Sequence, residues 1–163
     1  MNQAERLVAL LKSAGLVCAT AESCTGGGIG AAITAVPGSS EVFAGGIISY
    51  SNSVKERVLG VSAEALASFG AVSGEVAGEM ADGARRLTGA DVVVAVTGVA
   101  GPGGGTPEKP VGTVWFGIST PRRTRVEKKL FPGDREAVRN RTIEHALGML
   151  SVEALANTTP PAS

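Results

Sequence analysis

The segment 91–97 constrains the fold more than any other, because it contains an unbroken run of apolar and mostly β-branched residues. A strand with this pattern has both faces buried, which is typical of parallel sheets covered by helices on each side. Helix-like and strand-like segments alternate along most of the 163-residue chain. We therefore expect an α/β fold, a three-layer α/β/α sandwich around a mixed, mostly parallel sheet.

The individual elements follow from hydrophobic spacing and from capping and turn residues. Strands are predicted at 16–20, 43–50, 91–97, 111–119 and 125–131. The connection between the last two is short, so they should pair antiparallel. Helices are predicted over 3–14 and 26–36, over a short stretch from Lys55 to Leu59, and after the capping residues Ser62, Ser73 and Asp134. We expect residues 1–156 to form a single domain and residues 157–163 to be a disordered tail.

Composition excludes several classes of function. Fifteen basic and fifteen acidic residues cancel, so no overall field favours a nucleic acid or an anionic membrane as partner. No apolar run reaches the length of a membrane span, and the N-terminal segment lacks the apolar core of a signal peptide. One histidine and two cysteines do not suffice for a dedicated structural zinc site. The expectation is a soluble, cytoplasmic protein with no metal or cofactor.

Three of the predicted strands end in residues rich in hydroxyl groups and glycine. The first leads into a turn with Ser23, the second into a stretch with Tyr50 and Lys55, and the third, at Thr97, into a glycine loop over 98–105. In open α/β sheets, ligands bind beyond the carboxyl ends of the parallel strands. If these three strands are parallel neighbours, the three stretches meet at one crevice.

The first turn carries two possible nucleophiles, Ser23 and Cys24, ahead of a predicted helix whose N–H groups could hold a phosphate or an oxyanion. A serine needs a base, and the only histidine, His145, lies on the last helix without a triad partner, so we interpret it as structural or solvent-facing. Lys55 is the best placed lysine, provided burial lowers its pKa toward about 7–8. We favour Ser23 with Lys55. Cys24 is the rival, because a helix start lowers the pKa of a thiol.

Each of these features also has a plainer structural interpretation. Thr25 could simply be the N-cap of a tight turn, and Lys55 a solvated helix lysine. Arg135 and Arg139, four residues apart on one helix, could clamp a phosphate or form exposed ion pairs. The glycine loop over 98–105 could wrap a phosphate or be an ordinary surface loop. The residue pattern alone leaves these alternatives open.

Six stretches occur in order along the chain: Thr20-Ala-Glu-Ser-Cys-Thr-Gly-Gly, Tyr50-Ser-Asn-Ser-Val-Lys55, Gly70-Ala-Val-Ser73, Thr97-Gly-Val-Ala-Gly-Pro-Gly-Gly, Lys109-Pro-Val-Gly-Thr-Val-Trp-Phe116 and Phe131-Pro-Gly-Asp-Arg135. Together they resemble the CinA C-terminal domain family, the nicotinamide mononucleotide deamidases. The resemblance extends over about residues 4–150.

The resemblance implies an amidohydrolase that converts nicotinamide mononucleotide to nicotinate mononucleotide and ammonia in pyridine nucleotide recycling. It implies Ser23 as nucleophile, Lys55 as its base and Tyr50 as an assisting residue, with no metal. By the same resemblance, the nucleotide is held by the serine turn, the glycine loop and an arginine: Cys24, Thr25, Gly26, Gly27, Asn52, Thr97, Gly98, Gly101, Arg135 and Arg139. Nothing in the residue pattern itself specifies nicotinamide.

A second hypothesis is a nucleotide-binding domain without catalysis, which serves as a sensor or partner module. The same glycine loops and arginines would bind the nucleotide, and Ser23 would only donate a hydrogen bond to phosphate. A Ser-Lys peptidase is disfavoured, because no extended strand or apolar pocket for a peptide is evident. Apolar helix faces over 63–69 and 76–87 could support a homodimer.

Overall fold

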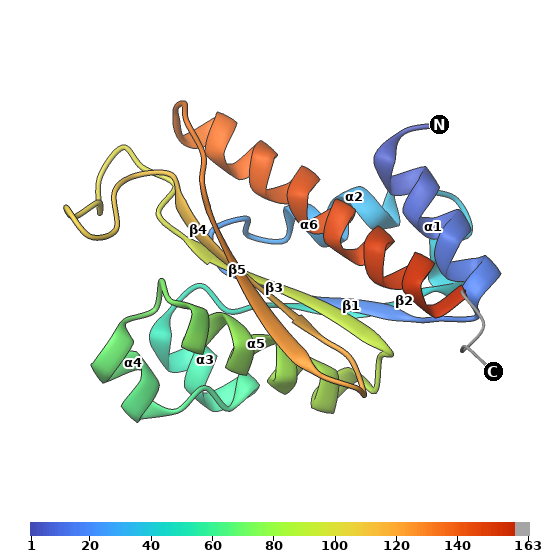
Figure 1. Ribbon diagram of the computed structural model, residues 1–163, viewed down its shortest axis with the longest axis horizontal. Coiled ribbons are helices and arrows are strands. Elements are labelled where there is room, and N and C mark those ends of the chain that lie inside the picture. Colours follow the sequence, from blue (N-terminus) through green and yellow to red (C-terminus); the bar gives the residue numbers. More distant parts are fainter. Residues whose placement is uncertain (159–163) are drawn as a thin grey trace.

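The computed structural model describes residues 1–158 and shows one five-stranded sheet with helices on both faces (Figure 1). The strands are β1 (Cys18–Glu22), β2 (Phe43–Ile48), β3 (Val92–Gly98), β4 (Thr113–Ser119) and β5 (Thr124–Leu130), in the spatial order β2-β1-β3-β4-β5. β1 is parallel to β2 and β3, whereas β4 is antiparallel to β3 and β5. The predicted α/β/α fold with a mixed sheet is confirmed.

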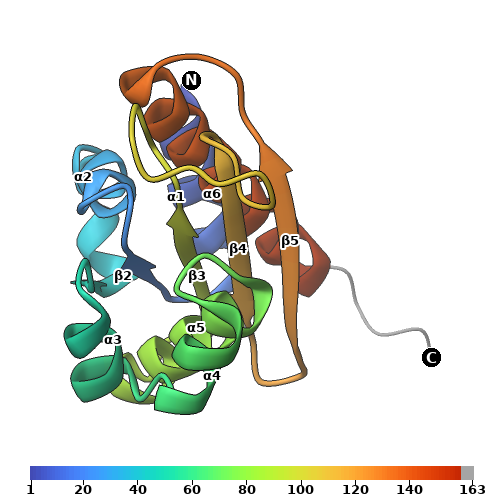
Figure 2. The same ribbon diagram turned by 90° about the vertical axis from the view of Figure 1, so that its left-hand side faces the viewer.

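The helices form two layers. α1 (Gln3–Ala14), α2 (Gly28–Thr34) and α6 (Arg135–Thr158) cover one face, and α3 (Asn52–Leu59), α4 (Ala63–Phe69) and α5 (Gly74–Thr88) cover the other (Figures 1 and 2). A short 3-10 helix, η1 (Ser39–Glu41), precedes β2. Helix α6 includes the first two residues of the predicted tail, and residues 159–163 lie outside the described residues. Among helices within residues 1–158, none is long and apolar enough to cross a membrane.

The valine-rich strand β3 supplies both apolar cores. Val92, Val94 and Val96 belong to the cluster packed under α1, α2 and α6, whereas Val93 and Ala95 belong to the cluster against α5. Successive side chains of a strand point to opposite faces of the sheet, so an unbroken apolar run fills both layers at once. This is the double burial that the sequence predicts.

The neighbouring strand β1 uses the same alternation to separate two polar side chains. Cys18 packs on the α1, α2 and α6 side, and Ala19 and Ala21 pack on the α5 side. Glu22 continues the row of Cys18, toward α2, and Ser23 continues the row of Ala21, toward the layer that contains α3. The two consecutive residues are thus directed to opposite faces of the sheet.

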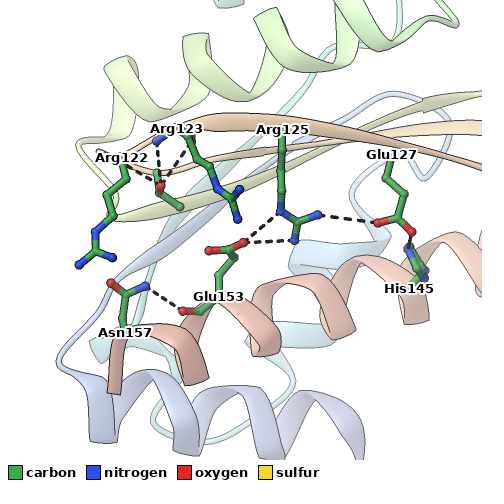
Figure 3. Close-up of polar contacts among 8 residues, drawn as sticks. Arg122, Arg123, Arg125, Glu127, His145, Glu153 and Asn157 are labelled. Carbon is green, nitrogen blue, oxygen red and sulfur yellow. Dashed lines mark hydrogen bonds and ion pairs between the residues drawn. The ribbon is translucent and has the colours of Figure 1, made fainter. Parts of the chain in front are cut away.

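The edge strand β5 is attached to α6 by polar contacts (Figure 3). Arg125 donates two hydrogen bonds to Glu153 Oε1, at 3.2 and 3.1 Å, and Glu127 Oε1 lies 3.0 Å from His145 Nε2. The His145 ring also packs edge-on against Phe116, with ring centroids 4.6 Å apart. His145 therefore has a structural role, as predicted.

The three parallel strands end at the same edge of the sheet. Glu22 is in register with Ile48 of β2 and with Val96 of β3. The next residues stay paired, because Ser23 N donates to Val96 O at 3.1 Å and Ser49 N donates to Glu22 O at 2.8 Å. The polar stretches that follow the three strands therefore meet, as expected from the sequence.

Candidate active site

A cavity of about 310 Å³ opens where these strands end. Its volume is at the lower end of the range for small-molecule sites. Nine of the predicted site residues line it: Ser23, Cys24, Tyr50, Asn52, Lys55, Thr97, Gly98, Gly101 and Arg135. The other four, Thr25, Gly26, Gly27 and Arg139, are not among the residues that line it.

Ser23 and Lys55 are in direct contact within this cavity. Lys55 lies in the first turn of α3, whose N-cap Ser51 accepts a hydrogen bond from Val54 N at 3.2 Å. Lys55 Nζ donates to Ser23 Oγ at 3.0 Å, and also to the backbone oxygens of Ser49 and Tyr50 at 2.8 and 3.1 Å. Both side chains are buried, with Lys55 1% and Ser23 8% exposed. Lys55 is therefore not the solvated helix lysine of the plainer interpretation.

The environment of Lys55 favours its neutral form. Burial lowers the pKa of its ammonium group below the ordinary value of 10.5, and the nearby Cys24 thiol acts in the opposite direction. Desolvation disfavours a charged group, and none of the hydrogen-bond acceptors that Lys55 contacts carries a charge. A lysine with a lowered pKa can accept a proton from a serine near neutral pH.

Cys24 is a poorer nucleophile here than its sequence position suggests. Burial, and to a lesser extent the Glu22 carboxylate, raise the pKa of its thiol to about 11, against smaller opposing contributions from its own backbone, Arg139 and Lys55. The thiolate is the reactive form of cysteine, and it is scarce at neutral pH when the pKa is so high. The expectation that the helix start would lower this pKa was wrong.

The start of α2 is already occupied by a side chain of the protein. Glu22 Oε1 accepts from Ile29 N at 2.8 Å, and Glu22 Oε2 accepts from Gly30 N at 3.0 Å. The N-cap is Gly27, with φ of 100°, and the Thr25 hydroxyl donates to Glu22 Oε1 at 2.6 Å instead of capping the helix. The amides that could have held a phosphate or an oxyanion at this helix start therefore bind a carboxylate of the chain itself.

The two arginines of α6 have different roles. Arg135 lines the cavity and donates to Gly101 O at 2.9 Å and to the Tyr50 hydroxyl at 3.3 Å. Within residues 1–158 it has no carboxylate partner, so its charge remains available to an anion. Arg139 donates instead to Cys24 O and to Thr25 O, both at 3.1 Å, and so holds the backbone of the serine turn. This geometry favours Arg135 as a phosphate ligand.

The remaining walls come from backbone segments and small residues. Thr97 Oγ1 donates to Ala71 O at 2.9 Å, which fixes the α4–α5 connection beside the end of β3. Ala71 and Val72 line the cavity. Both were absent from the predicted site, although they lie in the motif Gly70-Ala-Val-Ser73. Among the described residues, the one buried side-chain oxygen or nitrogen without a partner is Ser49 Oγ, next to the carbonyl that holds Lys55.

The cavity therefore combines a buried serine–lysine pair, a guanidinium group that has no carboxylate partner within residues 1–158, and the backbone of several glycines. This set of groups suits acyl transfer on a small molecule that carries an anionic group. The part of the chain that the structure describes contains no group of three or more His, Cys, Asp or Glu side chains able to hold a metal ion.

Sequence comparison matches residues 1–154 to the CinA C-terminal domain. A CinA-like protein of Citrifermentans bemidjiense is 52% identical over 157 residues, which are 96% of this chain and 38% of the relative. One of Parasynechococcus marenigrum is 52% identical over 155 residues, 93% of this chain and 37% of the relative. The chain thus spans a little over a third of the length of these curated relatives.

Solved structures show the same fold over nearly the whole chain. A competence-damaged protein (CinA) superfamily protein from Klebsiella pneumoniae has a TM-score of 0.91 and 35% identity, and the match covers 96% of this chain and 99% of that one. A competence/damage-inducible protein from Agrobacterium tumefaciens has a TM-score of 0.90 and 40% identity, with 96% and 94% covered.

Proposed function

The chain belongs to the CinA C-terminal domain family, and on that premise we propose that it hydrolyses the carboxamide of nicotinamide mononucleotide to nicotinate mononucleotide and ammonia. The observation that carries the proposal is the contact of 3.0 Å between Lys55 Nζ and Ser23 Oγ inside the cavity. The relatives' names do not mention this substrate, which comes from the resemblance of the motifs.

The proposed reaction proceeds through an acyl-enzyme. Ser23 Oγ attacks the carboxamide carbon while neutral Lys55 takes the hydroxyl proton. Lys55 then gives this proton to the departing amino group, the C–N bond breaks, and ammonia leaves. Water next attacks the ester carbon with Lys55 as base, which releases nicotinate mononucleotide and returns the proton to Ser23. No redox partner is required, because the C–N bonding pair leaves with nitrogen, each new C–O bond forms with a pair from oxygen, and no oxidation state changes.

Two further sets of groups stabilise negative charge on the substrate, one at the oxyanion and one at the phosphate. In residues 1–158, no protein oxygen accepts a hydrogen bond from the amides of Cys24 and Thr25, and we assign the developing oxyanion to these amides. Arg135 binds the phosphate, because its guanidinium lines the cavity and contacts only neutral acceptors. Tyr50 orients this arginine through its hydroxyl group and orients Lys55 through its backbone oxygen.

The test is ammonia release from nicotinamide mononucleotide by the purified protein without added metal. Ser23→Ala and Lys55→Ala should each lower kcat by at least a thousandfold, since nucleophile and base act as one unit. Ser53→Ala is the matched control, because Ser53 lies on the exposed side of α3 and contacts only Ser51 Oγ, at 3.4 Å. It should keep the wild-type rate. Cys24→Ala should keep most of the activity.

Three outcomes would change the conclusion. Loss of activity in Cys24→Ala with retention in Ser23→Ala would transfer the nucleophile role to Cys24. Nucleotide binding without any ammonia release by the wild type would favour the non-catalytic sensor. A rate in Lys55→Ala close to that of the wild type would exclude the serine–lysine mechanism.

A further inference from the structure

Glu22 is a buried carboxylate that the proposed chemistry does not use. The residue is 2% exposed, and no Lys, Arg or His within residues 1–158 forms an ion pair with it. Four hydrogen bonds compensate its burial, which is costly for an unpaired charge. They come from the amides of Ile29 and Gly30 and from the hydroxyls of Thr25 and Thr20, the last at 3.3 Å.

The donors of these hydrogen bonds lie on both sides of the proposed nucleophile, Ser23, along the chain. Thr20 lies before Ser23 on β1, whereas Thr25, Ile29 and Gly30 follow it, so one carboxylate joins both ends of the serine turn. The start of α2 adds a favourable electrostatic interaction, because a helix N-terminus attracts negative charge.

The turn itself is held at few other points. Ser23 N donates to Val96 O and Gly26 N donates to Ser23 O, both at 3.1 Å, and Gly28 N donates to Thr25 O at 3.0 Å. Arg139 of α6 also donates to Cys24 O and Thr25 O. No described contact other than the Lys55 hydrogen bond fixes the Ser23 hydroxyl. The direction of that hydroxyl therefore depends on the backbone of the turn, and the Glu22 side chain joins the strand before this turn to Thr25 and to the helix after it.

We propose that Glu22 is a positioning residue, whose carboxylate holds the serine turn so that Ser23 Oγ stays within hydrogen-bond distance of Lys55 Nζ. This inference rests on the proposed function. Glu22 does not touch the cavity, so it acts on the reaction only through Ser23 and leaves nucleotide binding unchanged. A neutral amide at this position cannot accept four hydrogen bonds, because its NH₂ group only donates.

The test separates the position of the nucleophile from the identity of the substrate. The second-order rate of covalent labelling of Ser23 by a fluorophosphonate probe is measured beside kcat, the dissociation constant for nicotinamide mononucleotide and the thermal midpoint. For Glu22→Gln we expect labelling and kcat to fall at least thirtyfold together, with a dissociation constant within threefold of the wild type.

A milder pair of variants keeps the test decisive if Glu22→Gln does not fold. Thr25→Val removes one of the hydroxyl donors and should lower labelling and kcat about tenfold, whereas Thr25→Ser, which keeps the hydroxyl, should restore both. Thr34→Val is the matched control, because the Thr34 hydroxyl donates to Gly30 O and Ala31 O within α2 and does not contact Glu22. It should label at the wild-type rate.

The outcomes are distinguishable from failure of the proposed function. If wild-type Ser23 is labelled but Glu22→Gln or Thr25→Val is labelled at an unchanged rate, the positioning role is wrong and the proposed function stands. Equal losses of labelling and nucleotide binding in Thr25→Val would also overturn it, since they indicate general damage to the cavity. If the wild type neither labels at Ser23 nor releases ammonia, the proposed function itself is wrong.

Discussion

Lys55 illustrates how one residue can be costly for stability and suited to the proposed chemistry. Its aliphatic stem is buried, and its amino group contacts one hydroxyl and two backbone oxygens but no carboxylate. A carboxylate partner would stabilise the charged form and make Lys55 useless as a base. Among residues 1–158 no carboxylate pairs with Lys55, so burial lowers its pKa without an opposing negative charge of this kind.

The pH dependence of stability should reveal this cost. Because folding lowers the pKa of Lys55 below 10.5, the unfolded chain binds more protons between the two values, and stability rises with pH in that window. Relative to Lys55→Met, the free energy of unfolding of the wild type should increase as the pH rises toward 10.5. The increase should be about 1.4 kcal/mol for each pH unit by which folding lowers the pKa of Lys55. Urea unfolding of both proteins at pH 7 and pH 10 measures the difference.

Lys12→Met is the control for this comparison. Lys12 lies partly exposed on α1 and pairs only with Glu41, at 3.8 Å, so its replacement should change stability by a similar small amount at both pH values. A difference between wild type and Lys55→Met that does not change with pH would contradict the lowered pKa.

At the scale of elements, the parts that could be predicted are those set by local pattern. The valine run of β3 predicted a doubly covered sheet, and Asp134 predicted the start of α6, where its carboxylate accepts from Ala137 N at 2.9 Å. The strand β1 was placed two residues early, at 16–20, because Glu22 does not look like a buried strand residue. The Glu22 carboxylate can be buried because two amides of α2 donate hydrogen bonds to it. A local sequence pattern does not contain this contact, because it forms only when α2 packs beside the end of β1.

The same reason explains why the sequence alone did not separate the roles of Arg135 and Arg139. Both lie on one face of α6, so spacing could not distinguish them. Arg139 meets Cys24 O and Thr25 O across more than a hundred residues of sequence, and Arg135 meets Gly101 O across 34. These contacts follow from where α6 lies on the sheet, which a local sequence pattern does not contain.

Helices α3 and α5 approach each other closely where Gly83 faces the backbone of Leu59. A Cβ atom added at Gly83 of α5 would lie 1.8 Å from Leu59 O, at the end of the helix that carries Lys55. That backbone oxygen cannot move alone, so Gly83→Ala should displace α3 and destabilise the protein by about 1–3 kcal/mol, despite the better helix propensity of alanine. Urea unfolding and kcat should both show the loss.

Gly78→Ala is the matched control in the same helix. A Cβ atom there would have Val126 Cγ1 as its nearest neighbour, at 3.4 Å, which a small side-chain movement relieves. We expect a change in stability within about 1 kcal/mol and an unchanged kcat. Equal stability of the two variants would show that the α3–α5 crossing is not tightly constrained.

At the scale of the whole molecule, the candidate site is built from segments distant in sequence around one central strand. β1 pairs with β2 on one side and with β3 on the other. Helix α2 connects β1 to β2 on one face of the sheet, and α3, α4 and α5 connect β2 to β3 on the opposite face (Figure 1). The cavity lies beyond the end of β1, as expected where the connections leave toward opposite faces of the sheet. Opening β1 should therefore require loss of the whole sheet.

Cys18 reports on this cooperativity. It lies on β1 with 0% exposure, and burial raises the pKa of its thiol to about 12. In a Cys24→Ala background, an aromatic disulfide reagent should label Cys18 at least about a thousandfold more slowly than in the unfolded chain, since domains of this size are stable by about 5–15 kcal/mol. The opening free energy from labelling should equal that from urea unfolding and fall with the same slope. Labelling at a rate that urea does not change below the transition would instead show that β1 opens locally.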